Sequence, residues 1–275
     1  MTTTQTTAPA QPRADSGQRL TFVRALRGEW IKLTTVRSTW WSIGIAAFLT
    51  VGMAALFALA VRDLGGAEAG FGPIEAVVSP VQFTMLLAGI IGAISVTGEY
   101  STGMIRSTLA ANPVRGSVLA AKAVVLAVFL FLASLVIFAL AAGVVTLMVA
   151  PDLSIDWADP EASILPILVT CLSMSVFALL GVAFGFILRS GAGAIAATVG
   201  ILFVLPTVSG FLTFAGESWA WLVDLFNYLP ASAASNAISP GEWATLEPSV
   251  AYLTLACWVA AGLLAAWGVL RTRDA

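Results

Sequence analysis

The side chains that most often perform chemistry in proteins are scarce in this sequence of 275 residues. It contains no histidine, which excludes imidazole proton relays, imidazole metal ligands and nucleophiles activated by histidine. Nothing in it matches the phosphate-binding pattern G-x-x-x-x-G-K-[ST]. Both cysteines, Cys171 and Cys257, lie in apolar runs, where we interpret them as small buried hydrophobes. The sequence therefore predicts no catalytic residue, no metal site and no cofactor bound by this chain.

Charged groups are also nearly absent from the long apolar runs. Lys122 is the only formal charge within them, and none of them contains Asp, Glu or Arg. Ion-coupled carriers and proton pumps hold their coupling ions with such groups, so a self-powered secondary carrier is disfavoured. If the protein moves a compound uphill, another polypeptide must supply the energy.

The segment 98–117, GEYSTGMIRSTLAANPVRGS, is the most informative local sequence. It begins with Glu99 at the end of an apolar run, where we expect a hydrated carboxylate. A short helix is predicted behind Glu99, with a stop at Asn112-Pro113. Apolar residues on this helix suit insertion into a groove on a partner protein, although a plain helical connector is the alternative. These residues are Met104, Ile105 and Leu109.

Residues 20–36 carry the pattern of an amphipathic helix that lies in the plane of the membrane. Its polar face would either bind anionic lipid headgroups or take part in docking a partner, and both roles can hold together. The apolar face comprises Phe22, Val23, Leu26, Trp30 and Leu33, and the other face carries Arg24, Arg27, Lys32 and Thr35.

Six apolar runs of at least 20 residues dominate the rest of the chain, which is 59% apolar and only 10% charged. Roughly 20 apolar residues in a helix span roughly 30 Å of hydrocarbon, so we predict an all-α membrane protein with six transmembrane helices. In the fourth run, Gly181 and Gly185 predict close packing between helices of the same chain. The runs are 40–61, 76–97, 120–149, 164–188, 192–214 and 251–270.

A dense aromatic and apolar stretch follows the fifth run, within the outer segment 215–250. It is too short to span the bilayer but apolar enough to dip into it. We expect this stretch to dip into the bilayer, with a surface-lying helix as the alternative. The stretch contains Trp219, Trp221, Leu222, Leu225, Phe226, Tyr228 and Leu229.

The distribution of charge predicts the topology. If the N-terminus is inside, twelve of the thirteen Lys and Arg residues lie in the cytoplasm and only Arg62 lies outside. Eleven of the fifteen acidic residues then lie outside. This bias favours cytoplasmic termini. Residues 1–18 are polar, lack the apolar region of a signal peptide, and predict a disordered tail. The remainder, 19–275, is expected to form a single transmembrane domain.

Three features together resemble the permease subunits of type-2 ABC transporters, the exporter type. They are the basic, Trp-bearing sequence GEWIKL at 28–33, the six apolar runs, and GEYSTGMIRSTLAANPVRG after the second run. The resemblance covers about residues 20–270. It implies that the N-terminal helix is the connecting or elbow helix, and that the segment after the second run is a coupling helix that docks into a separate ATP-binding subunit. It also implies short re-entrant helices between the fifth and sixth spans. The implied coupling residues are Glu99, Tyr100, Met104, Ile105, Arg106 and Leu109.

The resemblance also implies partners and a location. We expect a bacterial plasma-membrane permease that exports an apolar or amphipathic compound, with ATP and Mg²⁺ bound by the partner subunit. A second permease copy or paralogue would complete a dimer, with an outward path along its interface. We also expect the protein to contact membrane lipids and to bind no nucleic acid. The alternatives are a membrane scaffold that transports nothing and a channel or secondary carrier. An ATPase encoded beside this chain would favour the permease.

Overall fold

The computed structural model describes residues 21–64, 71–112, 114–149, 153–214, 216–241 and 244–272. Helices joined by turns and loops make up these residues, and no strand occurs among them. Six helical stretches of the described chain are long and apolar enough to cross a membrane. The predicted all-α polytopic fold is therefore confirmed, while the predicted tail 1–18 lies outside the described residues.

The six stretches overlap the six predicted apolar runs and differ from them by a few residues at their ends. The second is divided by a turn at Ser79-Pro80, and the fifth changes its helical pitch midway. They are α2 (Arg37–Leu64), α3 (Pro73–Val78) with α4 (Val81–Ser101), α6 (Arg115–Met148), α7 (Pro160–Leu188), α8 (Gly191–Val199) with η2 (Gly200–Val204) and α9 (Leu205–Leu212), and α12 (Pro248–Thr272).

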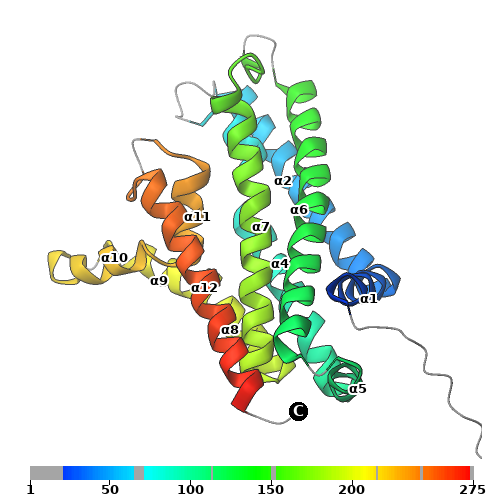
Figure 1. Ribbon diagram of the computed structural model, residues 1–275. Helices are drawn as coiled ribbons and strands as arrows, with labels where there is room; N and C mark the ends of the chain where they lie inside the picture. The colour runs from blue at the N-terminus through cyan, green and yellow to red at the C-terminus, as the bar shows by residue number, and fades with distance from the viewer. Residues whose placement is uncertain are drawn as a thin grey trace, which may run out of the picture.

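Helices α4, α6 and α7 form the buried centre of the bundle, and α2, α8–α9 and α12 lie at its periphery (Figure 1). The contact between α4 and α7 depends on glycine. A Cβ atom at Gly185 would lie 2.8 Å from the Val96 Cβ, and one at Gly181 would overlap the carbonyl oxygen of Gly89. Small residues let membrane helices approach closely, so the glycine pair serves packing within this chain, as predicted.

The fifth span contains a π-helical turn, η2, directly before Pro206. Proline has no N–H to donate to the preceding turn, and its ring crowds the carbonyl four residues earlier. A wider turn relieves that crowding and keeps the helix continuous. The span therefore runs from Gly191 to Leu212 without a break.

The segment between the fifth and sixth spans contains a 3₁₀ turn, η3 (Glu217–Trp219), and two short α-helices, α10 (Ala220–Phe226) and α11 (Pro230–Ile238). Helix α10 projects sideways from the bundle (Figure 1) and exposes Trp221 and Leu225. Helix α11 is buried against α7 and α12. The amide oxygen of Asn236 anchors the following loop by accepting hydrogen bonds from the backbone N–H groups of Thr245 (2.7 Å) and Leu246 (3.2 Å). Re-entry of these helices into a bilayer stays a prediction.

Candidate functional site: a buried ion cluster behind the coupling segment

Helix α1 (Phe22–Thr35) runs across the long axis of the bundle and packs against α6 (Figure 1). The Trp30 ring meets Phe129 of α6 edge to face, with centroids 5.9 Å apart. Leu33 packs against the core and Leu26 is half-buried, whereas Phe22 is exposed. Part of the apolar face predicted from the sequence therefore packs against the bundle, and the rest of it is exposed.

The coupling segment, residues 98–117, begins inside the last turn of α4. Glu99 and Tyr100 belong to that helix, which ends at Ser101. Gly103 then adopts a left-handed backbone (φ 73°) that only glycine takes up without strain. This turn starts the short helix α5 (Met104–Ala111) in a new direction, and the helix ends before Asn112 as predicted.

Four charged side chains from three helices meet in a buried ion cluster, which we define as Glu29 and Lys32 of α1, Glu99 of α4 and Lys122 of α6. The Lys122 Nζ lies 2.7 Å from the Glu29 Oε2 and 2.8 Å from the Glu99 Oε1. The Lys32 Nζ lies 2.7 Å from the Glu29 Oε1 and 3.1 Å from the Glu99 Oε1. Each lysine therefore bridges both carboxylates, and the formal charges cancel.

The ammonium groups of the ion cluster make two further contacts, one on α4 and one on α5. Lys122 donates to the backbone carbonyl of Ser95 at 3.3 Å. Lys32 reaches the Thr108 hydroxyl of α5 at 3.5 Å. The cluster thus lies directly behind α5 and joins it to α1, α4 and α6.

Burial and charge pairing oppose each other in the ion cluster. Burial alone would raise the pKa of Glu29, but the ammonium groups of Lys122 and Lys32 outweigh it and hold this pKa below its ordinary value. Burial alone would lower the pKa of Lys32, but hydrogen bonding and attraction from Glu29 and Glu99 raise it. Both groups are therefore held in their charged forms.

The structure corrects the predicted environment of Glu99. We expected a hydrated carboxylate at the membrane boundary, but Glu99 is only 3% exposed. Its Oε2 atom is buried and accepts no hydrogen bond from any residue that the structure describes. The expected position of Lys32 was also wrong, because this side chain turns inward to the ion cluster and not to a solvated face.

The other predicted coupling residues divide into buried and exposed groups. Ile105 is 2% exposed and belongs to the core, so it is not an outward-facing contact in this conformation. Tyr100 turns toward α7, where its ring packs edge to face on Phe186 and lies under the Arg189 guanidinium. Met104 and Arg106 are exposed, and Leu109 is half-buried against the core.

Sequence reasoning assigned no role to Glu29 or to the pairing of Lys122 with two carboxylates. Two signals pointed toward this site. Lys122 is the only charge in any apolar run, and an unpaired charge in a membrane span is costly. Glu29 and Lys32 lie three residues apart, the spacing that places two side chains on one face of a helix.

The ion cluster is suited to holding helices together. It joins residues that lie 23 to 93 positions apart in the sequence. The described part of the chain contains no group of three His, Cys, Asp or Glu residues that could hold a metal ion. The ion pairs link α1, α4 and α6 to one another.

The sequence matches the family model of the ABC-2 family transporter protein over residues 25–221. This range includes the whole ion cluster, the coupling segment and five of the six spans. No curated protein matches the chain at a significant level. The match covers well over half of the sequence and agrees with the six-span helical fold. The chain therefore belongs to the ABC-2 transporter family and is a multi-pass membrane permease subunit of an ABC transporter.

Proposed function

We propose that the chain forms half of an ATP-driven exporter for an apolar or amphipathic compound, and that a separate ATP-binding subunit docks on α5. The observation that carries this proposal is the ion cluster, which ties α5 to three helices of the bundle through Thr108 and Lys32. A push on α5 would therefore reach α1, α4 and α6 together. The partner subunit, and not this chain, would bind ATP and Mg²⁺.

The exposed surface of α5 and its neighbouring turns supplies the docking face. Met104 offers an apolar contact and Arg106 a cation, and both are accessible. Ile105, on the opposite side, is seated in the core and would transmit displacement of α5 to the bundle. The helix would thus work as a lever with one face toward the ATPase and one toward the permease core.

The distribution of arginine supports a cytoplasmic position for α5 and for both termini. Helix α5 and the end of α12 lie at the same end of the bundle (Figure 1). Arg115 and Arg189 donate to backbone carbonyls near the end of α12, and Arg271 lies over Trp267 there. Basic residues collect on the cytoplasmic side of membrane proteins. We assign this end to the cytoplasm of a bacterial cell.

Exposed apolar side chains support a partner permease and lipid contacts. They cover peripheral helices α2, α9 and α12, with Phe48, Phe211 and Leu264 well exposed. A second copy or a paralogue would bury part of this surface, and lipid would cover the rest. The translocation path would run along the interface between the two permeases.

Co-purification tests the docking proposal. Tagged full-length protein is extracted from its native membranes, and the ATPase activity that accompanies it is measured. The double variant Met104→Asp/Arg106→Glu should lose about tenfold or more of this activity, because both changes fall on the proposed docking face. Arg62→Glu, a charge reversal on an exposed residue of α2, is the matched control and should retain it.

Two outcomes would contradict the proposal. If the unaltered protein brings down no ATPase, a scaffold or a secondary carrier becomes the better interpretation. If the double variant and the control retain equal activity, α5 is not the docking site. Export that occurs with the wild-type ATPase and stops with a hydrolysis-deficient ATPase would support ATP hydrolysis by the partner as the energy source.

A further inference from the structure

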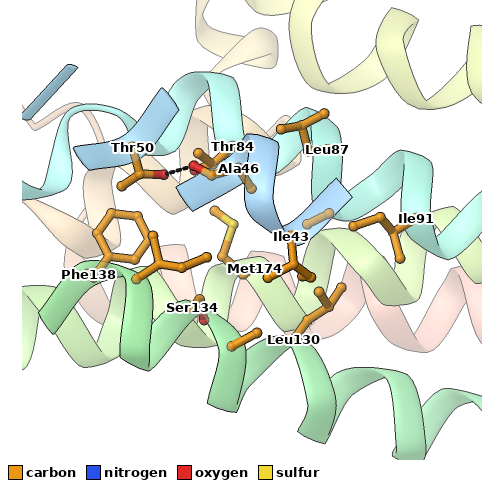
Figure 2. A pocket seen from close by; sticks show the side chains of 13 residues that line it. Ile43, Ala46, Thr50, Thr84, Leu87, Ile91, Leu130, Ser134, Phe138 and Met174 are labelled. Carbon is orange, nitrogen blue, oxygen red and sulfur yellow. Dashed lines mark hydrogen bonds between the residues drawn. The ribbon is translucent and has the colours of Figure 1, made fainter. Parts of the chain in front are cut away.

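A cavity lies beside the ion cluster, and Met104 at the start of α5 is among the residues that line it. This cavity, of about 440 Å³, lies between the junction of α1 with α2 and the second half of α4. Ligand pockets typically measure about 300–1,000 Å³, so this cavity is large enough for a small molecule. By contrast, the nearby cavity between α2, α4, α6 and α7 in Figure 2 is about 30 Å³, close to the volume of one water molecule.

The lining of the larger cavity is divided by polarity along α4. Leu87, Ile90 and Ile94 supply an apolar wall, and the ion cluster with the first turns of α2 supplies a polar wall. Leu87 and Ile91 line both cavities, so the small apolar cavity lies beyond the apolar end of the large one. A molecule with a polar head and an apolar chain matches this division.

Three hydroxyl groups on the polar wall have no hydrogen-bond partner among the described residues. They belong to Ser38, Thr39 and Ser42 near the start of α2. Ser95 and Thr102 also line the cavity, but their hydroxyls donate to backbone carbonyls at 2.7 and 2.8 Å. The three α2 hydroxyls are therefore available to a ligand.

The ion cluster on this wall is formally neutral, and Lys32 is its most accessible member. The Lys32 side chain is 33% exposed, whereas those of Glu29, Glu99 and Lys122 are 9%, 4% and 6% exposed. The Lys32 ammonium already donates to Glu29, Glu99 and Thr108, so the donors that remain for a ligand are the three α2 hydroxyls, which suit the oxygen atoms of a phosphate group. Phosphate is the common anionic group of membrane amphiphiles.

The volume sets the size of the apolar part. About 440 Å³ lies in the lower part of the range for ligand pockets, and we therefore place one alkyl chain inside the cavity and not two. A Cβ atom at Gly98, which lines the polar end, would meet no atom within 4 Å. The glycine thus leaves room that a larger side chain would fill.

We propose that this cavity binds the phosphate head and one alkyl chain of a membrane amphiphile, taken from the leaflet on the side of α5. The site belongs to a single chain and needs neither the ATPase nor a second permease. The bound amphiphile is either a two-chain phospholipid, with the second chain lying outside along α4, or a single-chain phosphate amphiphile.

Photo-crosslinking tests the site on the purified full chain in phosphatidylcholine nanodiscs. The probe is phosphatidylglycerol with a diazirine on one acyl chain, and labelled peptides are mapped by mass spectrometry. Labelling should concentrate on residues 36–42 and 87–94. Gly98→Leu should reduce it about fivefold or more relative to Gly143→Leu, a matched glycine change in α6 that also meets no atom within 4 Å and does not line the cavity.

A second variant tests recognition of the head independently of cavity filling. Ser38→Ala/Ser42→Ala should reduce phosphatidylglycerol labelling about fivefold or more, with little change for a diacylglycerol probe, which lacks the phosphate. Unlabelled lysophosphatidylglycerol and phosphatidylglycerol then compete, and the stronger competitor identifies a single-chain or a two-chain occupant. Equal labelling of both glycine variants, or no competition by either lipid, would overturn the proposal. Because no ATPase is present, this result is independent of docking on α5.

Discussion

Replacing Lys122 with Met removes the cation that ties α6 to both carboxylates of the ion cluster. Its ammonium contacts Glu29 and Glu99 within 2.8 Å, and its side chain is only 6% exposed. In the variant, two buried carboxylates face one remaining cation, Lys32, which leaves a net charge of −1. Removing one partner of a buried ion pair costs about 3–5 kcal/mol.

This loss should be visible in thermal stability. At about 2–4 °C per kcal/mol for a chain of this size, the midpoint of unfolding should fall by roughly 6–20 °C. The assay heats detergent-solubilised protein and measures the fraction that stays monodisperse by size-exclusion chromatography. Arg62→Met is the control, because its partner Asp63 is 3.9 Å away and both side chains are more than half exposed.

A double variant separates charge imbalance from lost packing. Lys122→Met/Glu99→Gln restores a formal charge of zero, with Lys32 still paired to Glu29. It should therefore be more stable than Lys122→Met alone, a coupling expected of residues in one network. A shift below about 2 °C for the single variant, or a double variant less stable than the single one, would refute the proposed role of the ion cluster.

Three further predictions concern pH, packing and topology. Folding lowers the pKa of Glu29, so the stabilisation that this carboxylate contributes is present above its ordinary pKa of 4.5 and is lost as the pH falls through its folded pKa. The difference in unfolding midpoint between the wild type and Glu29→Gln should therefore become smaller below the folded pKa. Gly185→Leu should prevent α4 and α7 from packing and reduce the folded yield, whereas Gly143→Leu, in open space, should not; equal yields would contradict that packing role. A cysteine at Ser154, in a protein lacking its native cysteines, should react with a membrane-impermeant thiol reagent in intact cells; no reaction would reverse the topology.

The spans could be predicted from the sequence because the bilayer imposes a requirement on each segment separately. A membrane helix needs roughly 20 consecutive apolar residues whatever its neighbours are. The six helices, the stop of α5 before Asn112 and the glycine contact in α7 all follow from such local patterns. The asymmetry of Lys and Arg predicts orientation in the same way, since it depends only on which segments are basic.

The ion cluster could not be predicted from the sequence, although Glu99 was singled out. Its position at the end of a span suggested hydration, but hydration depends on what covers the side chain. Here α1 and α6 bring Lys32 and Lys122 over Glu99, across 67 and 23 residues of sequence. The same dependence applies to Ile105, which the helical pattern marks as apolar without revealing whether it faces the core or a partner.

Sequence periodicity reports which residues share a face of one helix, and Glu29 with Lys32 is such a pair. The direction in which that face points depends on the rotation and crossing of every neighbouring helix. Only the tertiary structure decides that α1 crosses α6 with Glu29 inward, that Lys122 finds two carboxylates, and that a cavity remains beside them. Membrane insertion energies fix the spans one at a time, whereas the ion cluster and the cavity arise from packing between helices distant in sequence.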